Sequence, residues 1–391
     1  MKVAMLLLNQ GRGSGEVTRQ QAKHLIKRGH KVCFMHPRVG KGVAGAVNLD
    51  IELGTARIPV HEYLPAAGQD QQAVSTMPYK EAMAYLPAYE RALESVIDRV
   101  DIVIGHHANI SAVATHNVAR RHARPYVLFL HGTGIEPRHH GLYDDRIWQL
   151  IEQAVREAKG IIVTTEYVRD QLVKPLIDLP LDRFIVLPCG IDLEEFHPAN
   201  TDGIAAMYDL PETYVICPGA LTASKGPQNV VAASERYADL SPTIFIGAGE
   251  LREELERKLG DRGRFLGFVP SEDKARLINT ARLLVAAPEK KEHFGIIYAE
   301  ALAGGTPTVA YKGGGVSSIV TPEVGVLTER NPARLGQAVR GLLQDADCCS
   351  RMALAARARA EAHFCCRRLA ARLEQWLSRF YRRPDGMKKA A

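Results

Sequence analysis

Short apolar runs alternate with amphipathic segments along most of this 391-residue chain. In the first half, uninterrupted apolar runs predict strands that are buried on both faces of a sheet. A segment with helical spacing, Glu16–Arg28, lies between the first two runs. The alternation predicts βαβ units and a parallel sheet. The predicted strands are Val3–Leu8, Lys31–Met35, Asp101–Ile104, Tyr126–Leu130, Gly160–Val163 and Phe184–Leu187.

The second half of the chain repeats this pattern. Between the halves, Pro188–Pro198 ends a strand in Pro and Gly, and no apolar periodicity resumes before Tyr214, which predicts a hinge at residues 188–199. Two Rossmann-like domains are therefore expected, at residues 1–190 and 200–364. The predicted strands of the second are Tyr214–Pro218, Thr243–Ile246, Arg264–Phe268, Leu283–Ala287 and Thr308–Tyr311. Its predicted helices are Gln228–Tyr237, Leu251–Leu259, Asp273–Ala281, a short helix after Gly295, 332–343 and 347–361.

Two segments depart from the alternation. Between Gly40 and Tyr89 the periodicity is poor, and Pro, Ala and Gln are frequent. The terminal segment Cys365–Arg382 has apolar residues at helical spacing, which predicts a helix packed on one of the domains.

The composition, with 46% hydrophobic and 24% charged residues, is that of an ordinary globular protein. The apolar run Met1–Leu8 is too short for a signal segment, and no run approaches the roughly 20 apolar residues that a membrane span needs. The seven cysteines show no Cys-x-x-Cys spacing, which favours a reducing cytoplasm as the location.

Positive charge is concentrated near the end of the sequence. The net charge of the chain is +6, and residues 351–391 alone hold eleven Lys or Arg against three Asp or Glu. An anionic partner such as a membrane surface is one interpretation of this segment, and a solvated helix face is the favoured one. A nucleic-acid partner is not expected, because neither interleaved aromatic residues nor a known motif accompanies the charge.

The most informative stretch runs from Glu289 to Pro307. Gly295 allows a ligand to approach the backbone closely, and the amides of the next three residues, Ile296 to Tyr298, are expected to be unpaired at a helix N-terminus, where an anion is stabilised. Glu292 lies before this point, and Glu300 lies about one turn inside the helix. The two carboxylates are therefore expected to flank one elongated ligand, such as a phosphate joined to hydroxyl-rich groups.

These residues resemble a known family. Glu292 and Glu300 with seven residues between them, Phe294-Gly295, and the following Ala-Gly-Gly-Thr-Pro are similar to the retaining nucleotide-sugar glycosyltransferases of family 4. The resemblance implies an α/β, GT-B fold, in which two Rossmann-like domains have parallel sheets that face each other across a cleft. It also implies that residues 1–190 bind the acceptor, with 40–89 as a variable acceptor-facing region, and that residues 200–364 bind the nucleotide sugar. The helix at 365–383 would then pack back on the first domain.

The resemblance also assigns roles to individual residues. It implies that Glu292 meets the transferred sugar, that Glu300 holds the ribose hydroxyls, and that the amides of Gly295, Ile296 and Ile297 bind the diphosphate. A second cluster of residues binds the same ligand in the family. By resemblance these are Lys225 for the diphosphate, the loop with Phe268 and Val269 for the base, Gly13 in the glycine-rich loop for the phosphates, and His131 for the sugar. Glu292, His131 and Lys225 are the expected catalytic residues.

One position departs from the family pattern. Ala220 stands where the family has an arginine that holds the diphosphate. We expect another cation to replace it, and Arg12 in the Gly11–Gly15 loop is the favoured candidate, with Lys290 and Lys291 as rivals. An alternative interpretation of Arg12, a solvated loop charge, is equally open.

No metal site is predicted. His106-His107 and His139-His140 are adjacent pairs without a completing carboxylate or cysteine, and their side chains are expected to point apart. Asp345-Ala-Asp347 has the form of a metal-binding motif but lies between two predicted helices, far in sequence from the nucleotide-binding loops.

The resemblance, together with the absence of a predicted metal site, thus implies a retaining, metal-independent glycosyltransferase that uses no cofactor. Its expected partners are a nucleotide sugar, with UDP as the favoured nucleotide, and an acceptor hydroxyl on a small molecule or a lipid headgroup. Two alternatives remain open, a sugar-nucleotide 2-epimerase of GT-B fold and a non-catalytic partner subunit, which the missing arginine keeps in consideration.

Overall fold

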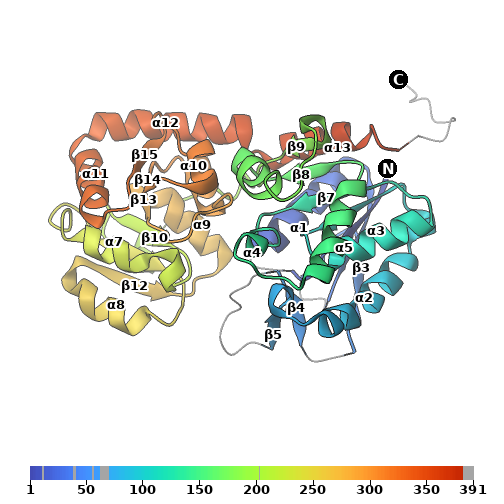
Figure 1. Ribbon diagram of the computed structural model, residues 1–391. Coiled ribbons are helices and arrows are strands. Elements are labelled where there is room, and N and C mark those ends of the chain that lie inside the picture. The colour runs from blue at the N-terminus through green and yellow to red at the C-terminus, as the bar shows by residue number, and fades with distance from the viewer. Residues whose placement is uncertain (11–12, 38–40, 55–56, 62–69, 202, 382–391) are drawn as a thin grey trace, which may run out of the picture. The chain divides into compact units, whose positions relative to one another are not determined.

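The computed structural model describes residues 1–10, 13–37, 41–54, 57–61, 70–201 and 203–381. The chain divides into two compact units. Unit 1 consists of Met1–Pro188 and the segment from Arg367 onward, and unit 2 consists of Cys189–Cys366. Figure 1 shows that each unit has strands in its interior and helices around them.

Unit 1 contains, among its described residues, a seven-stranded sheet in the order β3-β2-β1-β6-β7-β8-β9. All neighbouring strands are parallel. The strands are β1 (Lys2–Leu6), β2 (Lys31–His36), β3 (Val47–Asp50), β6 (Ile102–His106), β7 (Tyr126–Leu130), β8 (Ile161–Val163) and β9 (Phe184–Val186), and β4 (Ile58–Val60) pairs separately with β5 (Gln71–Ala73). The helices are α1 (Gly13–Lys27), α2 (Tyr79–Glu94), α3 (Ile110–Arg121), α4 (Glu136–His139), α5 (Asp145–Glu157) and α13 (Cys366–Leu377).

Unit 2 contains a six-stranded parallel sheet in the order β12-β11-β10-β13-β14-β15 among its described residues. The strands are β10 (Val215–Pro218), β11 (Thr243–Ile246), β12 (Gly263–Gly267), β13 (Leu283–Ala286), β14 (Thr308–Tyr311) and β15 (Gly325–Thr328). The helices are α6 (Ile204–Met207), α7 (Pro227–Ser234), α8 (Arg252–Leu259), α9 (Ser271–Thr280), α10 (Ile296–Ala303), α11 (Pro332–Gln344) and α12 (Ala346–His363).

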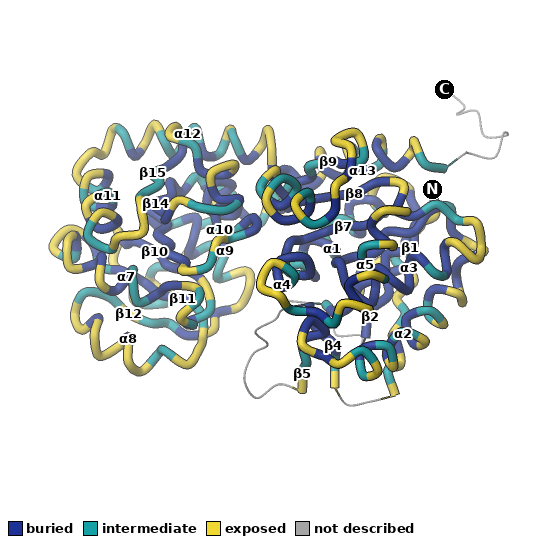
Figure 2. Tube along the Cα trace, viewed as in Figure 1, coloured by how far each residue is buried: buried dark blue, intermediate teal, exposed yellow. Residues whose placement is uncertain are grey.

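Both sheets have the burial pattern of doubly wound folds. Every residue of β6, β7, β10, β13 and β14 is buried, which is why these strands appear in the sequence as continuous apolar runs. In Figure 2 the central strands are dark blue, and exposed residues are concentrated on outer helices and loops. The predicted α/β fold with two Rossmann-like, parallel-sheet units is therefore confirmed.

The strand order locates the expected ligand-binding edge of unit 2. β10 and β13 are neighbours at the centre of the sheet. From β10 the strands continue in sequence order to β12 at one edge, and from β13 they continue to β15 at the other. Ligands of such sheets bind beyond the carboxyl ends of the strands, at the point where the order reverses. In unit 2 this point lies between the loops that follow β10 and β13.

Most predicted elements are present within one or two residues of the expected bounds. The helix predicted to begin at Glu16 instead starts at Gly13. A Cβ atom on Gly15 would lie 1.5 Å from the carbonyl oxygen of Gln10, so this glycine permits the first turn to form against the preceding loop. The sequence pattern had predicted neither the strands β3, β4, β5 and β15 nor the helices α2, α3, α4, α5 and α6. The first eleven residues of α2 fall within the 40–89 region of poor periodicity.

The terminal helix α13 packs on unit 1. Leu373 and Leu377 are fully buried, and the Trp376 ring covers Gly160, where a Cβ atom would lie 2.5 Å from it. Glu374 forms an ion pair with Arg28 at 2.5 Å. The segment that follows the division at Pro188 is held by unit 2, because the Ile191 amide donates to the Phe364 carbonyl at 2.7 Å. Whether residues 188–199 act as a hinge stays a prediction.

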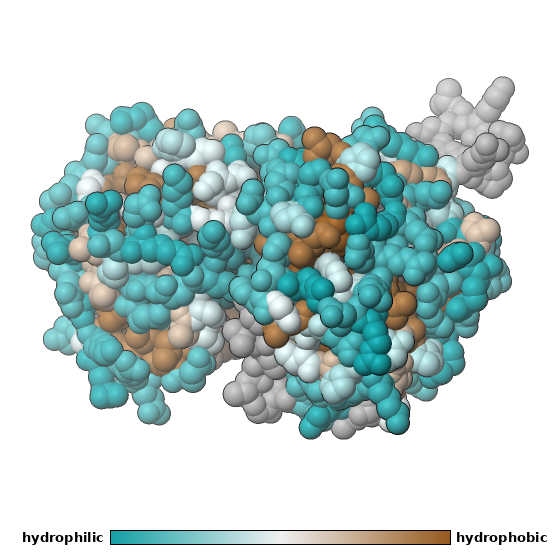
Figure 3. Space-filling model, viewed as in Figure 1, coloured by the Kyte–Doolittle hydropathy of each residue, from teal (hydrophilic) through white to brown (hydrophobic). Residues whose placement is uncertain are grey.

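Side-chain polarity on the surface is mixed. On the face drawn in Figure 3, hydrophilic residues cover most of each unit, and apolar residues show in separate patches. Within the described part of the chain, no helix has the length and apolar character needed to cross a membrane.

Candidate active site

The helix α10 begins where the sequence predicted an anion site. Gly295 has φ 85° and ψ 75°, in the left-handed region that glycine adopts most easily. A Cβ atom there would also lie 2.4 Å from the Tyr298 ring. The Tyr298 amide donates to the Gly295 carbonyl at 3.1 Å, so the expectation of three unpaired amides was wrong for Tyr298. Ile296 and Ile297 remain as the first-turn amides that have no helical carbonyl ahead of them.

Lys225 and Glu292 meet in front of this helix. Nζ of Lys225 donates to Oε1 of Glu292 at 2.8 Å, and the side chains are 49% and 22% exposed. The two residues are 67 positions apart in the sequence. The fold therefore brings together the lysine predicted to bind the diphosphate and the carboxylate predicted to meet the sugar.

Close backbone contacts fix the loop that carries Lys225. A Cβ atom on Gly226 would lie 1.8 Å from the Ala287 carbonyl oxygen, so this loop approaches the end of β13 as closely as glycine allows. The amides of Glu289 and Lys290 donate to the Ser224 carbonyl at 3.1 and 3.2 Å. The loops after β10 and β13 thus form one continuous surface.

The loop after β14 contacts the backbone of Glu292. The Gly315 amide donates to the Glu292 carbonyl at 2.7 Å. Gly314 has φ 60°, and a Cβ atom on it would lie 2.2 Å from the same carbonyl oxygen. The glycines after β14 therefore hold the backbone of Glu292 and leave its side chain for Lys225.

Glu300 has a partner that the sequence analysis missed. Nζ of Lys274 on α9 donates to Oε1 of Glu300 at 2.7 Å and lies 2.6 Å from Oε2. The Glu300 side chain is only 9% exposed, whereas that of Lys274 is 29% exposed. A lysine within an amphipathic helix usually faces solvent, so no pattern in the sequence indicated this contact.

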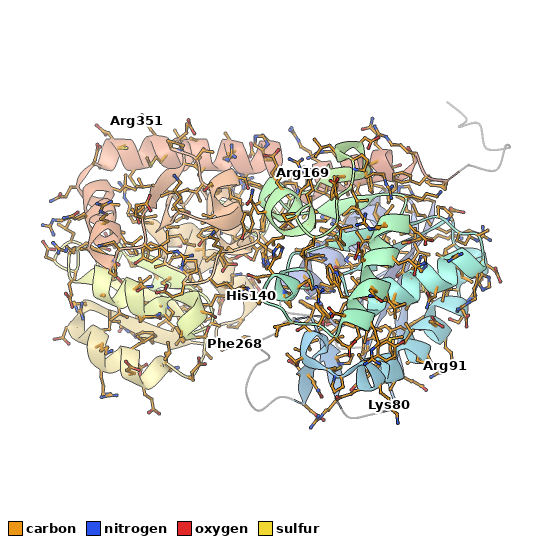
Figure 4. All side chains as sticks on the ribbon, in the orientation of Figure 1. Lys80, Arg91, His140, Arg169, Phe268 and Arg351 are labelled. Atoms are coloured by element: carbon orange, nitrogen blue, oxygen red, sulfur yellow. The ribbon has the colours of Figure 1, made fainter. Side chains whose placement is uncertain are left out.

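The aromatic residues of the predicted site have different environments. Phe294 is buried, and its ring contacts Phe364 edge-on with centroids 6.0 Å apart, so its side chain belongs to the core. Phe268 follows β12, is 84% exposed and is labelled in Figure 4. Its neighbour Val269 is buried. Of this loop, only Phe268 presents an aromatic side chain that a base could stack on.

The positions around the missing arginine can be placed in part. Ala220 is half-buried in the loop after β10. Lys291 is exposed and lies next to Gly313. An additional cation, Arg330, donates to the Glu289 carbonyl at 2.6 Å, and sequence analysis had not singled it out. Arg12, the favoured replacement, lies outside the described residues.

In unit 1, four histidines gather at the carboxyl ends of the strands. His61 follows β4, His106 ends β6, His107 follows it, and His131 follows β7. Nδ1 of His106 lies 3.1 Å from Nε2 of His131, and the His107 and His61 rings stack with centroids 3.8 Å apart. The expectation that His106 and His107 point apart was wrong, because both rings approach that of His131. The left-handed backbone of His107, with φ 72°, accounts for this turn.

The interior of this histidine cluster favours neutral rings. Burial lowers the pKa of His106 to about 3, and burial followed by repulsion from the neighbouring histidines lowers the pKa of His107. Both ring nitrogens of His107 are buried and have no hydrogen-bond partner among the described residues. Gly13, the remaining predicted phosphate contact in unit 1, is exposed at the start of α1.

Metal ligands are not assembled in the described parts of either unit. No group of three or more His, Cys, Asp or Glu side chains there has the geometry to hold a metal ion. Asp345 instead caps α12 by accepting a hydrogen bond from the Cys348 amide at 2.8 Å. His139 donates from Nε2 to the Leu172 carbonyl at 2.8 Å.

Two family models match the chain in succession. Residues 11–195 match Glycosyltransferase Family 4, and residues 208–359 match Glycosyl transferases group 1. The chain is a family 4-like member of the GT-B glycosyltransferases. This confirms the resemblance to family 4 glycosyltransferases, and the retaining mechanism stays a prediction.

Curated relatives agree with this membership. A D-inositol 3-phosphate glycosyltransferase of Xylanimonas cellulosilytica is 31% identical over 53% of this chain and 54% of its own length. A GDP-mannose-dependent alpha-(1-6)-phosphatidylinositol dimannoside mannosyltransferase of Mycobacterium tuberculosis is 26% identical over 47% of this chain and 49% of its own. The chain spans about half the length of the curated relatives it matches.

Two solved structures show the same fold over nearly the whole chain. Sucrose-phosphate synthase of Thermosynechococcus elongatus has a TM-score of 0.78 at 18% identity and covers 97% of this chain and 98% of its own. Anabaena HepE in complex with UDP has a TM-score of 0.73 at 17% identity and covers 97% of this chain and 100% of its own. At these identities the likeness concerns the fold alone.

Proposed function

We propose that this GT-B protein is a retaining glycosyltransferase that moves a sugar from a nucleoside diphosphate to an acceptor hydroxyl without a metal ion or other cofactor. One observation carries the proposal. Unit 2 places Lys225, Glu292 and the start of α10 together at the edge where the strand order reverses. A cation, two first-turn amides and a carboxylate at one point suit a diphosphate joined to a sugar.

The chemistry follows from the charges. As the bond between sugar and diphosphate breaks, negative charge grows on the diphosphate and positive charge grows on the sugar. Lys225 and the amides of Ile296 and Ile297 would stabilise the first, and the carboxylate of Glu292 would meet the second. Removing one preorganised donor of this kind typically costs on the order of a hundredfold in rate.

The identities of the nucleotide and of the acceptor are more specific proposals. UDP is favoured because Anabaena HepE, which shares the fold, was solved with UDP, although the mycobacterial relative is named as GDP-mannose-dependent. For the acceptor, the D-inositol 3-phosphate named for the Xylanimonas relative supports a small hydroxyl-bearing molecule. A lipid headgroup remains the other acceptor class, with peripheral membrane contact not favoured. A cytoplasmic location stays a prediction of the cysteine content.

A thermal-shift panel of UDP, GDP and ADP, each with EDTA, tests nucleotide binding. A ligand at 100 times its dissociation constant adds about 2.7 kcal/mol of stability, which is a measurable rise in Tm. No shift with any nucleotide would refute the proposal. Release of nucleoside diphosphate only when an acceptor is present would identify a transferase, and release without acceptor alongside an epimerised sugar would identify an epimerase. Binding without turnover would identify a non-catalytic partner subunit.

A further inference from the structure

The contact between Lys274 and Glu300 is the observation that extends the site furthest. Glu300 is a carboxylate whose side chain is 9% exposed, and an ion so far removed from water is costly unless it is paired. Lys274 supplies the charge from a different helix, 26 residues earlier in the sequence. The pair is therefore built by the fold and is not a local helix contact.

The two oxygens of Glu300 are not equivalent. Oε1 accepts a hydrogen bond from Lys274 at 2.7 Å. Oε2 is buried and lies 2.6 Å from the same ammonium, but no donor among the described residues is aligned to hydrogen-bond to it. A carboxylate has about four lone-pair sites and a single ammonium does not fill them, so the Glu300 carboxylate keeps accepting capacity for a hydroxyl group.

Lys274 is itself held in place. Its amide donates to the Pro270 carbonyl at 2.8 Å, and its ammonium lies 5.7 Å from the centroid of the buried Phe196 ring. Pro270 directly follows Phe268 and Val269, the loop predicted to receive the base. One short segment thus connects the expected base loop to the carboxylate expected to bind the ribose.

We propose that Lys274 is a positioning residue of the nucleotide site, which orients Glu300 so that its carboxylate accepts a ribose hydroxyl. It also neutralises a carboxylate that would otherwise repel the diphosphate. This inference rests on the proposed function, because it requires that unit 2 binds a nucleoside diphosphate.

The test compares UDP and GDP with their 2′-deoxy forms by calorimetry on the full chain. Lys274→Met should lower the affinity for the ribonucleotide by at least about tenfold, because it leaves a buried carboxylate unpaired. The same substitution should also reduce the preference for the ribonucleotide over the 2′-deoxynucleotide. Lys274→Arg, which keeps the charge, should recover part of both losses.

A double-mutant cycle separates positioning from a general structural effect. If Lys274 acts through Glu300, Lys274→Met should change affinity by less than about threefold in a Glu300→Gln background. Lys258→Met is the matched control, because Lys258 forms an exposed pair with Glu254 on α8 at 2.6 Å and should bind nucleotide as wild type does. Unfolding temperatures without nucleotide verify that each variant is folded.

The outcomes distinguish the two proposals. Wild-type protein that binds neither UDP nor GDP would refute the proposed function, and the inference with it. Wild-type binding with unchanged affinity in Lys274→Met, or equal losses with and without Glu300→Gln, would overturn the positioning role alone. If Lys274→Met does not fold, Lys274→Arg and Lys274→Gln replace it in the test. An unchanged preference for the ribonucleotide over the 2′-deoxynucleotide in both variants would then overturn the positioning role.

Discussion

Lys225 and Glu292 neutralise each other, with Nζ of the lysine 2.8 Å from Oε1 of the glutamate. The lysine is half exposed, and ion pairs of this kind contribute little to stability. An incoming diphosphate, with about two negative charges, can therefore draw the ammonium away from the carboxylate at small cost. The ion pair therefore keeps the ammonium and the carboxylate close to each other, and a bound ligand can still separate them.

The first prediction separates these two residues. Glu292→Gln should leave UDP affinity unchanged or slightly raised, because Lys225 is released from its partner, while turnover falls by roughly a hundredfold. Lys225→Ala should instead weaken UDP binding by at least about tenfold, since it removes a charge-assisted contact. Calorimetry and initial rates measure the two effects. Equal losses of UDP affinity in both variants would place Glu292 on the nucleotide.

The second prediction concerns Gly295. Alanine at this position would have to adopt the left-handed backbone of Gly295, and its Cβ atom would lie 2.4 Å from the Tyr298 ring. Gly295→Ala should therefore lower the free energy of unfolding by about 1–2 kcal/mol. Nucleotide affinity should fall further than stability explains, because the amides of Ile296 and Ile297 would shift. Urea unfolding and calorimetry measure both.

Gly341→Ala is the control for this substitution. Gly341 lies in α11 with nothing within 4 Å of an added Cβ atom, so alanine should be neutral or stabilising by about 0.5–1 kcal/mol. Gly295→Ala with wild-type stability and nucleotide affinity would show that the start of α10 does not depend on glycine.

The third prediction is a pH dependence of stability. Burial lowers the pKa of His106 to about 3, whereas the unfolded chain takes up the proton near pH 6.5. Between these values the unfolded state binds more protons, so stability is complete above about pH 6.5 and is lost as the pH falls toward 3. One such histidine contributes a slope of up to about 1.4 kcal/mol per pH unit.

His106→Phe keeps a ring in the cluster but removes this titration. Urea unfolding between about pH 7.5 and pH 5 should show a smaller decrease for the variant than for the wild type. Equal slopes in the two proteins would mean that His106 takes up its proton in the folded state as easily as in the unfolded one.

The fourth prediction concerns the terminal helix. Leu373 is fully buried where α13 packs on unit 1, so Leu373→Ala should lower the free energy of unfolding by about 2–5 kcal/mol. Leu354 on α12 is 76% exposed, and Leu354→Ala should stay within about 0.5 kcal/mol of wild type. Similar stabilities of the two variants, measured by urea unfolding, would show that α13 does not contribute to the core of unit 1.

The sequence predicted best what depends on continuous burial. The strands Tyr126–Leu130, Thr243–Ile246 and Thr308–Tyr311 have the expected bounds because uninterrupted apolar runs fit only a strand covered on both faces. The strand β15, Gly325–Thr328, was missed because three of its four residues are only half-buried and one is a threonine. In α2, Pro87 inside the helix obscured the helical spacing.

Side-chain pairings across the fold were the hardest features to predict. Lys225 and Glu292 were both selected by motif, but their contact is created by two loops that meet only after folding. Lys274 belongs to no motif, and its spacing is that of a solvated helix position. His61 and His107 stack although β5, α2 and β6 lie between them in the sequence. Such pairings follow from sheet order, which local patterns do not encode.

The last prediction concerns the missing arginine. Ala220 is half-buried in the loop after β10, whose backbone is fixed by the hydrogen bond from the Leu221 amide to the Ala248 carbonyl at 3.0 Å. An arginine placed on this rigid loop should add a cation for the diphosphate, and Ala220→Arg is expected to tighten UDP binding by roughly fivefold. The gain should shrink as salt increases, because the added attraction is electrostatic.

Ala223→Arg provides the matched control, since it adds the same charge to an exposed position nearby. An equal gain in both variants would reflect net charge alone and not a specific site. The same substitution also tests Arg12, which the sequence favours as the natural replacement. Arg12→Ala should reduce turnover at least tenfold, about 1.4 kcal/mol in activation free energy, and adding Ala220→Arg should restore part of the loss. Wild-type turnover in Arg12→Ala would shift the role to Lys290, Lys291 or Arg330, of which Arg330 already donates to the Glu289 carbonyl beside the site.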